Sequence, residues 1–409
     1  MDVNSFVIGY QKGKASVPPA SGGGVVELNI AYGDTAPEDT TKLWVKTSEV
    51  ENIEVVTTTP VGDGNYVAST LRTVLPAPTS GIAVTAVGNK IYLFGGYQYG
   101  GAGNSNKIYR FNSENNKLTE VGETLPTACN GASAVADGKK IYFLCDGTNA
   151  IHVFNTENET LSTLNITLPA NLRGCATCMV DGVIYMFGGY ENGAVTPYVY
   201  KFDTKTNESA KAVNSFSSAI YGHCAASVGK IIYVFGGSQN NVAITTIHMF
   251  NTENETFSTL STRLTKATSY MRACALGNEI YLFGGIEGSV ISNKIQVFNT
   301  DSKELKVLSE VLPLAVRSLG EVTLGEKIYL FGGATSSSTG TDMINVFSNT
   351  PVFNLTKNHL LIVGSINIGM LESAPSIDIG VRDVYVGTEN NESTKVPTAF
   401  YNGEEWETV

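Results

Sequence analysis

The chain has 409 residues, of which 27 are Lys or Arg and 38 are Asp or Glu, so its formal net charge is −11. Only 16% of the residues are charged, against about 25% in an average soluble domain. The small number of basic residues argues against a nucleic-acid surface, and no stretch approaches the roughly 20 apolar residues of a membrane helix. The 42 glycines and 42% apolar residues exclude a disordered chain and a coiled coil.

The first 65 residues divide by composition into two parts. Residues 1–25 contain two prolines and three consecutive glycines between Ser16 and Gly24, which predicts a flexible tether or anchor. Residues 26–65 contain short apolar pieces that predict a small β segment. Asp2 stands where a signal peptide carries positive charge, so we expect a protein made in the cytoplasm without a signal peptide.

A repeat of about 48 residues organises residues 66–350. Each copy contains four short strand-like segments separated by turn signals. Because a sheet of this length cannot bury both faces alone, the copies must stack radially into a propeller. Six copies of the string Ile-Tyr-x-Phe-Gly-Gly, some with small changes, predict six blades; they begin at Ile91, Ile141, Ile184, Ile232, Ile280 and Ile328.

This pattern resembles the kelch repeat family of β-propellers. The resemblance rests on the period, on the Ile-Tyr-x-Phe-Gly-Gly string and on the Phe-Asn or Phe-Asp pair that follows it, such as Phe202-Asp203. Two features depart from the family pattern. The Trp typical of the outer strand is absent, and Cys145-Asp146 replaces one Gly-Gly pair, which makes the second blade irregular.

The sequence also predicts how the ring closes. Residues 69–81 align without a gap with residues 162–174, so an outermost strand precedes the first blade. The last blade lacks this strand, because the chain runs into Ser348-Asn-Thr-Pro351. We therefore predict that residues 67–74 complete the sixth blade and remove an open sheet edge.

Residues 351–409 form a C-terminal β-rich segment by the same criteria. Ring closure brings positions 66 and 350 together, so this segment and residues 26–65 are expected to pack as a small β-rich domain or to form two extensions. The sequences of these two segments, including Tyr-Asn-Gly-x-x-Trp before residue 407, resemble terminal segments of phage or prophage tail-fibre and virion-appendage proteins. That resemblance implies location in a virion, with other virion or assembly proteins as partners of the termini.

The residues give no sign of a catalytic, metal or cofactor set. Cys175-x-x-Cys178 has no second pair at zinc spacing, and the inner-strand cysteines stand among Ala and Gly, where blades converge and small residues pack. His152 and His248 occupy similar strand positions and are interpreted as packing or edge residues. We expect neither metal nor cofactor and lean against an enzyme.

An enzymatic alternative nevertheless exists. A kelch propeller can be a sugar mutarotase, in which an acidic group and a basic or polar one near the channel mouth exchange a proton with an anomeric hydroxyl. The inner-strand starts offer Arg173, His223, Arg272, Arg317 and Glu321 as candidates. Arginines at the start of an inner strand, however, more often anchor neighbouring loops.

The loops that enter the inner strands and those that join the second and third strands emerge on one face. They present tyrosines amid Asn, Gln, Ser, Thr and Gly, a chemistry suited to stacking on sugar rings or to adaptable protein recognition. We predict a non-enzymatic recognition or adhesion module for a bacterial surface glycan or protein; the second alternative is a purely structural decoration protein. The predicted ligand-binding residues are Tyr97, Tyr99, Asp146, Arg173, Tyr190, Glu191, Tyr221, His223, Tyr270 and Arg317.

Overall fold

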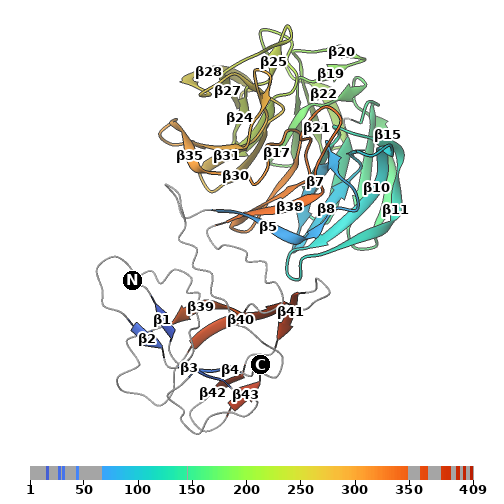
Figure 1. Ribbon diagram of the computed structural model, residues 1–409. Coiled ribbons are helices and arrows are strands. Elements are labelled where there is room, and N and C mark those ends of the chain that lie inside the picture. The colour runs from blue at the N-terminus through green and yellow to red at the C-terminus, as the bar shows by residue number, and fades with distance from the viewer. Residues whose placement is uncertain are drawn as a thin grey trace. The chain divides into compact units, whose positions relative to one another are not determined.

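A computed structural model of the chain describes residues 67–144 and 146–348, together with short strands near both ends. The chain divides into two units, Val61–Val352 and the combination of Met1–Pro60 with Phe353–Val409. The elements of the described residues are β-strands (Figure 1). No helix in this part of the chain is long and apolar enough to cross a membrane.

Unit Val61–Val352 is built from antiparallel four-stranded meanders. The first three follow the order of the chain. They are β7 (Ala83–Val87), β8 (Lys90–Phe94), β10 (Gly103–Asn112) and β11 (Lys117–Cys129); β12 (Ser133–Asp137), β13 (Lys140–Leu144), β14 (Ala150–Asn155) and β15 (Thr160–Thr167); and β17 (Ala176–Val180), β18 (Val183–Phe187), β21 (Val199–Asp203) and β22 (Glu208–Lys211).

The next three meanders continue the repeat, and the last takes its fourth strand from the N-terminal side. They are β23 (Cys224–Val228), β24 (Ile231–Phe235), β27 (Thr246–Asn251) and β28 (Thr256–Arg263); β30 (Arg272–Leu276), β31 (Glu279–Phe283), β34 (Lys294–Asn299) and β35 (Leu305–Val311); and β36 (Gly320–Leu324), β37 (Lys327–Phe331), β38 (Met343–Ser348) and β5 (Val67–Val74).

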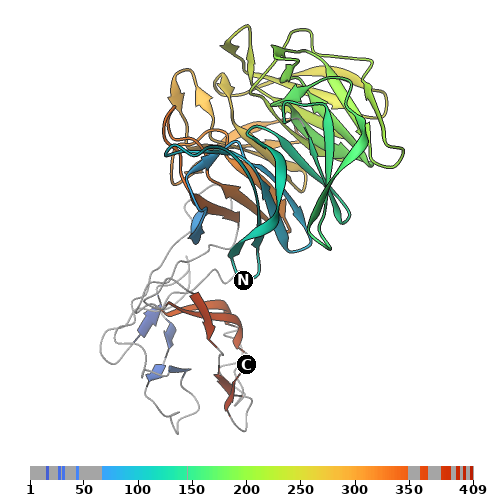
Figure 2. The ribbon, with the colours of Figure 1, turned by 90° about the vertical axis from the view of Figure 1, so that its right-hand side faces the viewer.

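The innermost strands contact one another in a closed cycle. In order around the axis they are β7, β12, β17, β23, β30 and β36, and β36 returns to β7. Figures 1 and 2 show the meanders arranged radially about this axis. The predicted all-β propeller is therefore confirmed.

The predicted closure of the ring is also confirmed. Strand β5 pairs with β38, with Ala68 opposite Phe347 and Ser69 opposite Val346. Leu71 and Leu75 from this N-terminal segment are buried in the core between the last and first meanders. The strand thus covers the edge that β38 would otherwise expose.

Aromatic packing between neighbouring blades explains the Ile-Tyr-x-Phe repeat. The Tyr of each second strand lies against a Phe in the third strand of the next blade. Such aromatic pairs contribute about 0.5–1.5 kcal/mol beyond the area they bury. With ring centroids 5.2 to 5.8 Å apart, the pairs are Tyr92–Phe154, Tyr142–Phe202, Tyr185–Phe250, Tyr233–Phe298, Tyr281–Phe347 and Tyr329–Phe111.

Two physical conditions require glycine at the first position of the Gly-Gly pair. Gly284 has a φ of 60°, in the left-handed region. A Cβ built there would lie 2.2 Å from the carbonyl oxygen of Val316, which belongs to the loop entering the next blade. Only glycine meets both conditions.

Two-residue strands occupy the channel-side loops for which the sequence predicted no regular structure. Most of them form small hairpins beside the main meanders. They are β6 (Thr79–Ser80), β9 (Tyr97–Gln98), β16 (Leu172–Arg173), β19 (Tyr190–Glu191), β20 (Ala194–Val195), β25 (Ser238–Gln239), β26 (Val242–Ala243), β29 (Thr268–Ser269), β32 (Ile286–Glu287) and β33 (Val290–Ile291).

The second unit contains short strands from both ends of the chain. Apart from residues 15–17, the predicted tether lies outside the described residues, as do the packing of residues 26–65 with 351–409 and Cys145. Strand pairs are β1 (Ala15–Val17) with β2 (Val26–Leu28), β3 (Ile30–Tyr32) with β4 (Leu43–Val45), β40 (Ile379–Gly387) with both β39 (Leu360–Ile366) and β41 (Ser393–Val396), and β42 (Ala399–Tyr401) with β43 (Trp406–Thr408).

Candidate functional site

A cavity of about 1050 Å³ lies at the channel mouth, where the inner strands begin. Residues from the start of every inner strand line it, so each blade contributes to one common wall. Eight of the ten predicted ligand-binding residues belong to this wall. They are Tyr97, Tyr99, Arg173, Tyr190, Tyr221, His223, Tyr270 and Arg317.

One residue per blade forms a backbone collar around this mouth. These residues have φ between 51° and 70°, in the left-handed region. Five backbone hydrogen bonds link neighbours: the amides at positions 131, 174, 270, 318 and 81 donate to the carbonyls at 81, 131, 222, 270 and 318. The collar consists of Gly81, Gly131, Gly174, Gly222, Tyr270 and Ser318.

Tyr270 is the unusual member of the collar. It has a φ of 56° at a position where four other blades have glycine. A bulky residue in this conformation costs about 1–2 kcal/mol relative to glycine. Its ring lies over Gly222, where an added Cβ would meet the ring at 3.4 Å. Backbone strain of this kind is a reason to look for a function.

Tyr270 belongs to an aromatic arc made of three tyrosines and one arginine, which come from four consecutive blades. The ring of Tyr221 lies 5.8 Å from that of Tyr190 and 6.3 Å from that of Tyr270. The Arg317 guanidinium carbon lies over the Tyr270 ring, 5.7 Å from its centroid, in a cation–π contact. The arc thus presents aromatic faces and one cation to the cavity.

A second aromatic pair lies on the first blade. The rings of Tyr97 and Tyr99 meet edge to face, 5.2 Å apart. The hydroxyl of Tyr99 is 3.1 Å from that of Ser80, which fixes its position beside the cavity. Tyr97 is 41% exposed and is therefore free to contact a ligand.

Deeper in the cavity, Arg272 and Glu321 lie together. The Arg272 Nε donates a hydrogen bond to the carbonyl of Leu319 at 2.9 Å and lies 3.5 Å from Glu321 Oε2. Burial raises the pKa of Glu321 to about 7, although the nearby Arg272 opposes the shift. The pair supplies a carboxyl group that can take up or release a proton near neutral pH.

Asp146 lies outside the cavity wall. Its buried carboxylate accepts hydrogen bonds from the amide and the hydroxyl of Thr148, at 3.0 and 2.6 Å. The His152 ring lies 3.7 Å away. Burial raises the pKa of Asp146, but these polar neighbours outweigh burial, and the pKa lies below its ordinary value. The carboxylate stabilises the irregular turn of the second blade.

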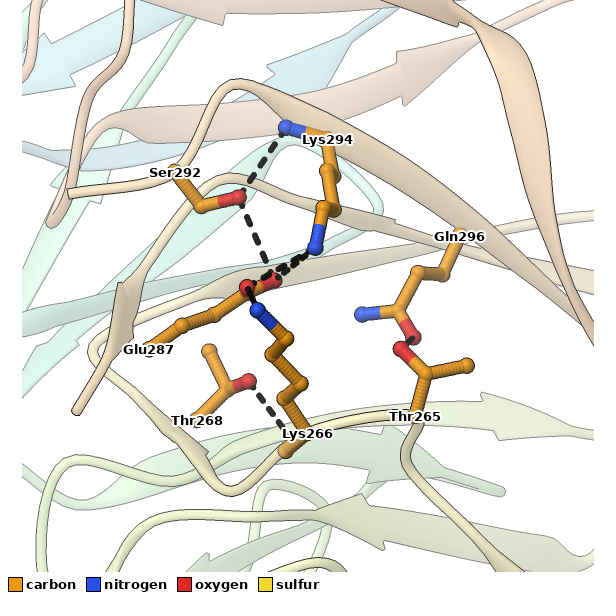
Figure 3. Close-up of polar contacts among 7 residues, drawn as sticks. All are labelled: Thr265, Lys266, Thr268, Glu287, Ser292, Lys294 and Gln296. Carbon is orange, nitrogen blue, oxygen red and sulfur yellow. Dashed lines mark hydrogen bonds and ion pairs between the residues drawn. The ribbon is translucent and has the colours of Figure 1, made fainter. Parts of the chain in front are cut away.

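Glu191 also lies outside the wall, and its side chain bonds to a residue that follows in the same loop. It accepts a hydrogen bond from the Thr196 hydroxyl at 2.8 Å. The equivalent residue two blades later, Glu287, shows the same arrangement more fully: the Lys266 and Lys294 side chains both point at its carboxylate (Figure 3). Ser292 bonds Glu287 at 3.3 Å, as Thr196 bonds Glu191. An acidic residue here positions the hairpin.

His223 lies in the wall, but its ring packs between blades. The side chain is buried, and Nε2 lies 3.0 Å from the carbonyl oxygen of Phe187. Burial lowers the pKa of His223 to about 4, so the ring is neutral at physiological pH. The packing role predicted for the inner-strand cysteines is confirmed, since Cys175, Cys178, Cys224 and Cys274 are all buried. Within 67–144 and 146–348, no cluster of three His, Cys, Asp or Glu side chains could hold a metal ion.

Comparison with protein families agrees with this architecture. The model of the KLHDC2/KLHL20/DRC7 Kelch-repeats domain matches residues 65–189 and 144–333. The chain belongs to the kelch-repeat family. No curated protein matches it.

Among solved structures, that of YjhT is similar to the kelch propeller. The TM-score is 0.58 at 12% sequence identity, and the match covers 68% of this chain and 96% of that chain. At this identity the likeness shows the fold alone. Kelch-repeat propellers typically serve as protein-interaction modules.

Sequence reasoning missed two features of the kelch propeller's mouth. One is Asn130, whose side-chain oxygen accepts a hydrogen bond from Arg173 at 2.8 Å and so orients the guanidinium. The other is the collar. Its signal was present in the repeats, because Tyr270 and Ser318 align with glycines 48 residues apart in the preceding copies.

Proposed function

We propose that this kelch propeller is a non-enzymatic recognition module that binds a bacterial surface glycan or protein at its channel mouth. The observation that supports it best is the convergence of tyrosines from several blades on one cavity. Tyrosine offers a large, rigid contact area at low entropic cost and carries a hydroxyl that can bond a ligand.

The proposal includes a place in a phage or prophage particle. Its support is the resemblance of the terminal sequences to those of tail-fibre and virion-appendage proteins. The termini would then dock to other virion or assembly proteins, while the propeller faces the host. Capsid or tail genes beside the coding gene would support this placement, and a neighbourhood of metabolic genes would contradict it.

Binding of the labelled full chain to glycan arrays and to bacterial surface proteins tests the recognition proposal. We expect binding that the double variant Tyr97→Ala plus Tyr190→Ala abolishes. Tyr198→Ala is the matched control, because Tyr198 is 37% exposed and lies outside the cavity wall. Failure to bind any glycan or surface protein would contradict recognition and favour a purely structural role.

A second candidate function is sugar mutarotation. The observation that favours it is the Arg272–Glu321 pair in the channel, with the Glu321 pKa raised to about 7 by burial. A carboxyl group with this pKa suits general acid–base exchange with an anomeric hydroxyl. Anomer exchange measured by NMR, lost in Glu321→Gln, would support the enzyme; no exchange with any sugar tested would exclude it.

A further inference from the structure

The charge of the cavity wall is opposite to that of the whole chain. The wall carries Arg173, Arg272 and Arg317 against a single acidic residue, Glu321, a formal charge of +3 − 1 = +2. The chain as a whole has a net charge of −11. A concave surface of one sign concentrates ligands of the opposite sign. The cavity therefore favours an anionic ligand.

Two of the three arginines are available to a ligand. Among the described side chains, neither Arg173 nor Arg317 forms an ion pair with a carboxylate. On the outer surface, by contrast, Lys107 and Lys230 pair with glutamates. In the order of the ring, Arg173 and Arg317 stand on blades three places apart, so they face the axis from opposite sides.

Tyr270 positions one of these arginines. The Arg317 guanidinium makes a cation–π contact with its ring, and the Tyr270 backbone is held in the collar on both sides. A cation–π contact holds a guanidinium near the ring without using its N–H donors, which stay free to bond a carboxylate. Glycine would satisfy the collar without strain, so the strained backbone of Tyr270 points to a role for its ring in the cavity.

The remaining wall favours a sugar over an acidic peptide. Asn130, Asn171 and Asn192 add amide groups, and Ser80 and Ser133 add hydroxyls, all of which suit sugar hydroxyls. The strongly exposed apolar side chains of the neighbouring hairpins, which a peptide would use, lie outside the wall. They are Val242 and Val290.

We propose that the channel mouth binds a carboxylated sugar residue, with Arg317 bonding the carboxylate, Arg173 adding positive charge from the opposite side of the mouth, and Tyr270 as the positioning residue for Arg317. This inference rests on the recognition function proposed above and names its ligand class. The aromatic arc stacks on the sugar ring, while the amides and hydroxyls bond its polar edge.

The test uses the full chain on an array of carboxylated, sulfated and neutral glycans together with acidic peptides. We expect binding confined to carboxylated glycans. Reduction of the carboxyl group of the bound glycan to an alcohol should weaken its binding at least about tenfold, because the charge-assisted bonds are lost. This comparison leaves the protein unchanged, so folding cannot account for the result.

Protein variants assign the roles. Arg317→Gln should weaken binding about tenfold or more and abolish the preference for the carboxylated over the reduced glycan. Tyr270→Asn should reduce affinity with no fall in melting temperature, because Asn tolerates the left-handed conformation. The control is Arg263→Gln on strand β28, an exposed arginine outside the wall, which should bind normally.

Several results would overturn the inference. If neutral glycans bind and Tyr97→Ala plus Tyr190→Ala abolishes this binding, recognition stands and the carboxylate assignment is wrong. Binding of acidic peptides alone leads to the same conclusion. Equal affinity for the reduced glycan, or an unchanged preference in Arg317→Gln, also contradicts it. If no array member and no surface protein binds, the proposed function fails as well.

Discussion

At the scale of single residues, two glycines of the fifth blade, Gly284 after the second strand and Gly277 in the turn after the inner strand, separate backbone strain from steric clash. Gly284 and Gly277 have nearly the same φ, 60° and 62°. A Cβ on Gly284 would lie 2.2 Å from a backbone oxygen, whereas one on Gly277 would meet nothing within 4 Å. Only the first position combines backbone strain with a steric clash.

We therefore expect Gly277→Ala to lower the free energy of unfolding by about 1 kcal/mol, the cost of the left-handed conformation. Gly284→Ala should lower it by about 3 kcal/mol or more, because a backbone must also move. Urea unfolding of both variants measures the difference. Equal losses would show that the close approach between blades is not a constraint.

Glu321 gives a pH-dependent prediction at the same scale. Its pKa in the folded chain is about 7, raised by burial, whereas an unfolded Glu titrates near pH 4.3. The folded chain therefore binds more protons between these values, and its stability falls as pH rises through this window. Above pH 7 the partly buried carboxylate is charged and destabilises the fold.

Glu321→Gln removes this titration. The free energy of unfolding of the variant minus that of the parent should be larger at pH 8 than at pH 5. The increase should be on the order of 2 kcal/mol. Urea unfolding at both pH values measures this, with Glu326→Gln in an exposed turn as the control. The same relative stability at both pH values would show that Glu321 is not buried as a charge.

Residue type alone does not tell whether a loop carboxylate faces a ligand. Asp146 and Glu191 stand in the loops that the sequence assigned to the binding face, yet both bond neighbouring Thr side chains and lie outside the cavity wall. The tyrosines were easier to place, because an aromatic ring in a short channel-side hairpin has few internal partners. The direction in which a tyrosine side chain points follows from its position in the repeat. The direction of a carboxylate side chain depends on single local hydrogen bonds.

At the scale of elements, strand β5 carries the closure of the ring. An ungapped internal alignment predicted it, because the strand has the same sequence pattern as β15 (Thr160–Thr167). The short hairpins at the mouth were not predicted, since two-residue strands have no periodic pattern to detect. The sequence thus predicted the strands that recur with the period of the repeat.

Removal of β5 should expose the edge of β38 and the core that Leu71 and Leu75 cover. A chain that begins at residue 76 is expected to aggregate, because an open strand edge pairs with other chains. A chain that begins at residue 61 keeps the strand and should remain soluble. Size-exclusion chromatography compares the two. A soluble, cooperatively melting chain from residue 76 would contradict the closure.

At the scale of the whole molecule, the kelch propeller converts a sequence repeat into a convergent site. Six repeats separated along the chain each place one collar residue and one loop at the same mouth. Blade packing uses the positions that recur in all six copies of the repeat, such as the Tyr–Phe pairs, so the loops are free to differ. The cationic, tyrosine-rich wall is the product of those differences.

The affinity of the full chain for the glycan or protein found on the arrays tests the central claim most directly. Calorimetry should show that Tyr97→Ala plus Tyr190→Ala weakens binding at least about tenfold, a loss of about 1.4 kcal/mol, while Tyr198→Ala leaves affinity unchanged. Unchanged affinity in the double variant, or an equal loss in Tyr198→Ala, would contradict recognition at the channel mouth.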